Sequence, residues 1–130
     1  MIVVDASAVV EWLLQTTAGQ RIQHRISSQP NSLHAPHLLD VEVLHTFRRS
    51  VRQGGLTPSR AEEAIQDLLD LRIVRYPHSV LLPRMWRLRN NVSAYDAAYV
   101  ALAEGLGAVL LTHDARLASA PGHSVRVEVY

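Results

Sequence analysis

Short apolar runs alternate along this chain with segments of helical periodicity. Runs rich in Val, Ile and Leu stand at residues 1–5, 33–35, 73–74 and 108–112, and an alternating run stands at 124–129. Apolar runs without polar alternation are typical of strands that are buried on both faces. Strands separated by helices predict a mostly parallel sheet with helices on both faces. We therefore expect a small three-layer α/β domain.

Helical segments fill the intervals between these runs. Apolar residues recur at i, i+4 spacing through residues 38–53, and Pro58 suits the first position of the next helix. The chain has 130 residues, the size of one ordinary domain, and carries no repeat or linker, so we expect one domain over residues 1–130. The other helices are expected at 6–14, 17–27, 57–71, 80–88, 93–104 and from 114 to 118.

The composition excludes several classes of chemistry. The chain has no cysteine, which excludes disulfides and thiolate zinc sites. All 13 basic residues are arginine, and the absence of lysine excludes P-loop and Schiff-base lysine chemistry. No basic segment precedes the first apolar run, and no apolar run reaches the roughly 18–20 residues of a membrane span. We expect a cytoplasmic protein without a membrane segment.

Four acidic residues stand where the predicted elements begin or end. Asp5 and Asp114 directly follow strand-like runs, and Glu42 and Asp96 lie in the first turns of two helices. Ligands of parallel α/β sheets bind beyond the carboxyl ends of the strands. Carboxylates held beside a core repel one another unless a cation joins them, and Mg²⁺ or Mn²⁺ prefers such oxygen ligands. The four acids together predict metal-assisted phosphodiester chemistry.

Each of these acids also has a purely structural interpretation. Asp5 and Asp114 suit the N-cap position of the helices that follow them. Asp96 completes a capping-box pattern with Ser93, and Glu42 suits a solvated helix face. No single acid is decisive, so the prediction of a metal site depends on their joint placement.

Three sequence runs and one helix resemble a known family. The runs are Val-Val-Asp-Ala-Ser-Ala at residues 3–8, Ser-Ala-Tyr-Asp-Ala-Ala-Tyr-Val-Ala-Leu-Ala at 93–103 and Leu-Thr-His-Asp-Ala-Arg-Leu at 111–117, and the helix is that of Glu42. In order and spacing they resemble a PIN domain, and within that family a VapC-type toxin of a bacterial toxin–antitoxin pair. The resemblance covers essentially the whole chain.

The resemblance implies which residues form the site. Four acids match the family's catalytic and metal-binding positions: Asp5, Glu42, Asp96 and Asp114. Ser7 matches the small polar residue after the first acid, and Thr112 matches the hydroxyl of a Thr-x-Asp element. The resemblance further implies a Rossmann-like fold and a Mg²⁺-dependent endoribonuclease, commonly acting on tRNA or a ribosomal RNA loop. It also implies a homodimer and a VapB-type antitoxin, whose tail presents a cation to the acidic pocket.

Arginine and aromatic residues give weaker indications of RNA binding. A basic stretch suits either RNA-backbone contacts or a solvated surface. Trp12, Trp86 and Tyr95 suit either stacking on bases or packing in a core or interface. The stretch is formed by Arg84, Arg87 and Arg89, and a second stretch with the same two interpretations is formed by Arg48, Arg49 and Arg52.

Partner surfaces are expected on the helices at 38–53 and 57–71, which carry more apolar surface than one small sheet face covers. Exposed apolar surface of this kind usually marks an interface, so we expect a groove for the antitoxin there. Dimer contacts are expected nearby or on the helices at 80–88 and 97–102.

Two other functions stay open from the residues alone. One is a non-catalytic module that binds RNA or a protein partner on the same fold. The other is an aspartyl-phosphate hydrolase, which needs an Asp-x-Asp pattern after the first strand. Ser7 stands at the second of those positions, and no lysine is present to support the phosphate.

Overall fold

A central sheet with helices between its strands makes up the protein. The computed structural model describes all 130 residues. In chain order the elements are β1 (Ile2–Val4), α1 (Ala6–Leu13), α2 (Thr17–Ser27), β2 (Leu33–Pro36), α3 (Leu38–Arg52), α4 (Pro58–Asp70), β3 (Ile73–Tyr76), α5 (Leu82–Arg87), α6 (Ala94–Leu106), β4 (Val109–Thr112), α7 (Ala115–Ser119) and β5 (Val127–Val129).

The five strands form one sheet in the order β3-β2-β1-β4-β5, and every pairing is parallel. This confirms the predicted α/β class and makes the sheet fully parallel. The chain starts at the central strand β1, builds outward to β3, and then crosses to β4 on the other side. The point where strand order reverses lies between β1 and β4, and ligands of open α/β sheets bind at such a point.

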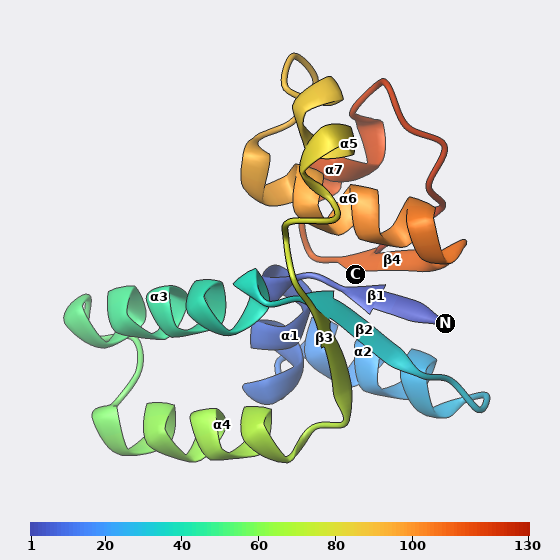
Figure 1. Ribbon diagram of the computed structural model, residues 1–130. Coiled ribbons are helices and arrows are strands. Elements are labelled where there is room, and N and C mark those ends of the chain that lie inside the picture. The colour runs from blue at the N-terminus through green and yellow to red at the C-terminus, as the bar shows by residue number, and fades with distance from the viewer.

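Helices cover both faces of the sheet (Figure 1). Helices α1 and α2 pack together on one face, while α5 and α6 lie on the other. Helices α3 and α4 form a hairpin that contacts α1 and projects past the sheet. The hairpin therefore keeps one long side away from the core.

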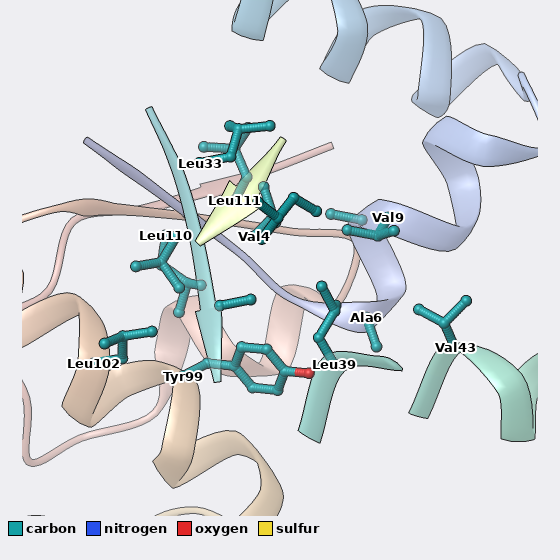
Figure 2. Packing of buried hydrophobic residues seen from close by; sticks show 14 of the residues in the cluster. Val4, Ala6, Val9, Leu33, Leu39, Val43, Tyr99, Leu102, Leu110 and Leu111 are labelled. Atoms are coloured by element: carbon teal, nitrogen blue, oxygen red, sulfur yellow. The ribbon is translucent and has the colours of Figure 1, made fainter. Parts of the chain in front are cut away.

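The core centres on β1 and α6. All three residues of β1 are fully buried, and every residue from Ala97 to Ala103 of α6 is buried. Figure 2 shows the Tyr99 ring extending from α6 among these side chains toward Leu39 of α3. The expectation of dimer contacts on residues 97–102 is wrong, because the fold itself buries them.

For two of the element boundaries that differ from the predicted ones, the structure gives a local reason. The helix expected from residue 80 begins at Leu82, since His78 to Leu81 close a turn with a 2.8 Å hydrogen bond from Leu81 N–H to the His78 carbonyl. The strand expected at 124–129 covers only 127–129, and the N–H of Val125 is instead bound by the His123 ring at 3.2 Å. None of the helices is both long and apolar enough to span a membrane.

Candidate active site

The four predicted acids line one cavity at the carboxyl edge of the sheet. Asp5 follows β1, Asp114 follows β4, Glu42 comes from α3 and Asp96 from the first turn of α6. The cavity has a volume of about 300 Å³. Because β1 and β4 are neighbours at the reversal of strand order, their ends bring two of the acids together, and α3 and α6 supply the other two.

Asp5 is the most constrained of these carboxylates. It is 5% exposed and caps α1 by accepting the Ala8 N–H at 2.9 Å. The Ser7 hydroxyl donates to the same oxygen at 2.7 Å, and the Thr112 hydroxyl donates to the other oxygen. Burial raises the pKa of the Asp5 carboxyl above its ordinary value, although the hydrogen bonds from Thr112 and Ser7 act in the opposite direction.

Two hydroxyl groups connect Asp5 to the turn that follows β4. The Ser7 oxygen accepts the N–H of His113 at 2.9 Å, and the Thr112 oxygen accepts the N–H of Asp114 at 3.0 Å. Each hydroxyl therefore accepts from the backbone and donates to Asp5. This gives Ser7 and Thr112 a positioning role, because together they fix both the carboxylate and the turn that carries Asp114.

Glu42 is held by a residue to which the sequence patterns gave no role. The Tyr99 hydroxyl donates to Glu42 Oε1 at 2.7 Å, and Tyr99 is only 1% exposed. Burial raises the pKa of Glu42, the Tyr99 hydrogen bond lowers it, and the charges of Asp5 and Asp96 raise it further. Tyr99 lies three residues after Asp96, on the same side of α6, and that spacing is the signal that would have identified it.

The pKa values of Asp96 and Asp114 are shifted in opposite directions. Burial and repulsion from Asp114 raise the pKa of Asp96, whose N–H is capped by the Ser93 hydroxyl at 3.1 Å. Arg116 binds Asp114 with two side-chain hydrogen bonds of 3.1 and 2.9 Å and holds the pKa of that carboxyl below its usual range. The pocket thus contains three carboxyls with raised pKa values and one that is already paired.

Other lining residues were not predicted. Glu11 stands one turn after Ser7 on α1 and contributes a fifth carboxylate to the cavity, beside His113 and Thr46. Its oxygens already have partners, because Thr16 donates to one and the His113 ring lies 3.5 Å from the other. Its i+4 spacing from Ser7 is the signal that would have pointed to it.

The donor chemistry of the cavity fits a hard divalent cation. As the side chains stand, no three of the His, Asp or Glu groups are close enough to hold one ion between them. Mg²⁺ does not require such a closed set, because it usually binds through one or two carboxylates and keeps several waters. No cationic side chain is paired with Asp5, Asp96 or Glu42, whereas Asp114 is paired with Arg116, so Asp5 and Asp96 remain the expected direct ligands.

The predicted basic stretch lies apart from this cavity. Arg84 is paired with Glu104 at 2.7 Å and lines a different cavity, beside Met1 and Val109 at the amino ends of the strands. Arg87 is exposed, and Arg89 lies over the Trp86 ring at 4.6 Å from its centroid. RNA contacts by these three arginines stay a prediction, and for Arg84 the ion pair gives a sufficient structural role.

Fold and site together define a parallel α/β domain with an acidic cavity at its reversal of strand order. A PIN domain model matches residues 2–122, and the chain belongs to the PIN domain family. The chain is 46% identical to Ribonuclease VapC1 of Mycobacterium tuberculosis over 121 residues, which are 92% of this chain and 90% of that protein. It is 39% identical to Ribonuclease VapC12 of the same organism over 129 residues, 99% and 98% of the two chains.

A solved structure agrees in fold. The structure of VapBC2 from Rickettsia felis, bound to a promoter DNA fragment, matches with a TM-score of 0.68 at 13% identity and covers 100% of this chain and 99% of that one. At this identity the match supports the fold alone.

Proposed function

We propose that this protein is a metal-dependent endoribonuclease that acts as the toxin of a VapBC-type toxin–antitoxin pair. The observation that carries the proposal is the convergence of Asp5, Glu42, Asp96 and Asp114 on one cavity at the carboxyl edge of the sheet. The similarity to VapC ribonucleases over nearly the whole chain supports the same activity. Structured RNA, such as tRNA or a ribosomal RNA loop, is the proposed substrate class, and the cytoplasm is the proposed place of action.

Asp5 and Asp96 would hold the ion, with Asp114 and Glu42 beside it. When bound, Mg²⁺ or Mn²⁺ supplies positive charge at the scissile phosphate and makes water more acidic. Glu42 is suited to accept a proton, because its raised pKa increases its basicity and Tyr99 fixes its orientation. Ser7 and Thr112 keep Asp5 in place through the hydrogen bonds that each donates to it.

Cleavage of RNA by the purified chain tests the proposal. Cleavage is expected with Mg²⁺, is expected to stop in chelator, and should be lost in Asp5→Asn and in Asp96→Asn. Asp67→Asn is the matched control, since Asp67 is an exposed acid on α4 away from the cavity. Equal cleavage by all four proteins would contradict the assignment and would favour a contaminating nuclease or a non-catalytic binding module.

An antitoxin is the proposed partner of the α3–α4 hairpin. A cavity of about 640 Å³ lies along these helices, lined by apolar side chains that include Val41, Leu44, Phe47, Val51 and Ile65. Val41 is 67% exposed and Leu44 is 48% exposed, so the surface is available to an apolar segment. The similarity in fold to VapBC2 of Rickettsia felis is in keeping with a partner of this kind.

The antitoxin is further proposed to inhibit by placing an arginine in the acidic cavity. A guanidinium offers a planar set of donors that matches paired carboxylates, and here it would take the place of the metal. Replacing that arginine with alanine should weaken inhibition more than complex formation, because the apolar groove still holds the tail. Parallel titrations of RNA cleavage and of complex formation test this, and equal losses in both would favour simple steric cover.

A homodimer is proposed as well. Helix α5 remains available for such contacts, with Leu82 54% exposed and Trp86 68% exposed. Light scattering of the purified chain tests this, and a strict monomer at all concentrations would contradict it.

A further inference from the structure

The acidic cavity cannot hold RNA by itself. Its carboxylates repel the phosphates of a substrate, and a single-stranded nucleic acid needs cationic groups for its backbone and aromatic rings for its bases. If the proposed ribonuclease function holds, those groups must lie next to the acids. A neighbouring cavity provides both.

A second cavity of about 510 Å³ adjoins the acidic one. The two share Glu42 and Thr46 as lining residues, so they are continuous along α3. The second cavity is also lined by His45, Arg49 and Tyr95. Its volume lies within the roughly 300–1,000 Å³ that is typical of pockets for small ligands.

The residues of α3 that line the second cavity follow one another along the helix, away from the acids. Glu42, His45, Thr46 and Arg49 follow one another at i, i+3, i+4 and i+7 and therefore share one face of the helix. Arg49 stands about 10 Å along the helix axis from Glu42 at 1.5 Å per residue. The adjacent face, with Leu39, Val43 and Phe47, is buried in the core.

Arg49 is free to bind a phosphate. It forms no ion pair with any carboxylate, and its one side-chain hydrogen bond is with the ring of His45 at 3.3 Å. Arg25, Arg60, Arg75, Arg84, Arg116 and Arg126 are paired with acids, so their charge is already compensated. An unpaired guanidinium beside the acidic cavity is suited to bind an anionic ligand that extends from that cavity into the second one.

Tyr95 supplies the aromatic surface. It is 60% exposed although it directly precedes Asp96, whereas Tyr99 on the next turn is 1% exposed. Packing in the core is therefore excluded, and packing in an interface stays the alternative for this residue. The ring stands at the wall of the second cavity, beside one of the proposed metal ligands.

We propose that this second cavity is a nucleotide-binding subsite, in which Tyr95 stacks on a base of single-stranded RNA and Arg49 binds a backbone phosphate. The nucleotide held there lies next to the scissile phosphate, so the subsite selects unpaired RNA and sets the position of the cut. The proposal depends on the ribonuclease function and assigns its substrate contacts. His45 supports Arg49 through the 3.3 Å hydrogen bond between their side chains.

Binding of a short labelled single-stranded oligoribonucleotide of mixed sequence tests the subsite. Anisotropy is measured on the full chain with Mg²⁺, in an Asp5→Asn background that prevents cleavage. Tyr95→Ala should weaken binding about tenfold, as expected for loss of one base stack, and Tyr95→Phe should bind like the parent. Arg49→Ala should weaken binding and reduce the slope of log affinity against log salt by about 0.7, while Tyr95→Ala leaves that slope unchanged.

The matched controls are exposed residues with side chains of the same kind, a ring and an arginine. His24→Ala removes another exposed ring, and Arg52→Ala removes another unpaired arginine of α3, and neither lines the subsite. Both should bind RNA like the parent. In the chain that retains Asp5, Tyr95→Ala and Arg49→Ala should raise KM with little change in kcat, because the contacts are made equally in ground and transition states.

Several results would overturn the subsite while leaving the ribonuclease function intact. One is parent-like RNA binding in both variants, and another is an equal loss in the two controls. A third is parent-like RNA binding with weakened antitoxin binding, which would make the cavity a partner site. A chain that cleaves RNA but binds no oligoribonucleotide would also overturn the subsite alone. A chain that neither binds nor cleaves RNA would overturn both proposals.

Discussion

Tyr99→Phe is the substitution that isolates one contact of the acidic site. It removes a single oxygen, the donor of the 2.7 Å hydrogen bond to Glu42, and leaves the buried ring in place. Burial and the neighbouring Glu42 raise the pKa of Tyr99, so the phenol is protonated and acts as the donor at all relevant pH values. The variant therefore tests whether Glu42 is positioned by Tyr99.

The expected loss of stability follows from the charge of the acceptor. A hydrogen bond to a charged group contributes about 1.5–3 kcal/mol, and the lower value applies because Glu42 lies at the edge of a cavity that water can enter. For 130 residues the unfolding entropy is about 0.27 kcal/mol/K, so a loss of about 1.5 kcal/mol lowers Tm by about 5 °C. Cleavage should fall as well, since Glu42 loses its fixed orientation.

The pH dependence separates this hydrogen bond from a packing effect. The Tyr99 hydrogen bond lowers the pKa of Glu42, so its loss raises that pKa further in the folded state. A carboxyl with a raised folded-state pKa lowers stability above that pKa, and the effect disappears below its unfolded value of 4.5. The difference in Tm between Tyr99→Phe and the parent should therefore shrink as the pH falls from 7 to below 4.5.

Melting curves in chelator across this pH range provide the assay. Tyr130→Phe is the matched control, because it removes a 3.0 Å hydrogen bond from another tyrosine to Glu128, which keeps Arg25 as a partner. The control should lose less stability and no cleavage activity. A Tm difference for Tyr99→Phe that stays constant down to acid pH would refute the reasoning and would mean that the hydroxyl acts only through packing.

Three further predictions concern the charges of the cavity. In chelator, Asp96→Asn should keep or raise Tm. Burial and the charge of Asp114 raise the pKa of Asp96 and so disfavour its ionised form at neutral pH. A clear drop in Tm would mean that Asp96 mainly stabilises its helix. Mg²⁺ at about 100 times its Kd should add about 2.7 kcal/mol of stability to the parent, and a melt of Asp5→Asn should show a much smaller gain. Arg116→Ala should raise the pKa of Asp114 toward its ordinary value of 3.8, as followed by NMR titration of the carboxyl, and an unchanged pKa would show that the ion pair does not form in solution.

Local patterns in the sequence predicted the elements and placed the acids at their ends. The apolar run that became β1 gave the central strand, and Pro58 and Ser93 marked the starts of α4 and α6. The strand order could not be predicted in the same way, since it depends on which side of β1 each crossover takes. The boundary at Val125 was missed because a side chain 2 residues away binds its N–H.

Contacts between distant residues were beyond the sequence patterns. Tyr99 and Glu42 are 57 positions apart, so neither residue carries a local sign of the other. The repulsion expected between the clustered carboxylates does raise the pKa values of Asp5, Glu42 and Asp96, but burial raises them more. Asp114 differs from the other three acids, since Arg116 lowers its pKa.

The capping and the metal-site interpretations of the acids are not alternatives in this structure. Asp5 and Asp114 accept backbone N–H groups at the starts of α1 and α7, and Asp96 lies in the first turn of α6. Unpaired N–H groups at a helix start favour negative charge, so these positions offset part of the repulsion before any ion binds. We therefore expect the fold to form without metal. Asparagine is consequently the informative replacement at Asp5, because it keeps an N-cap oxygen and removes the charge, whereas alanine removes both.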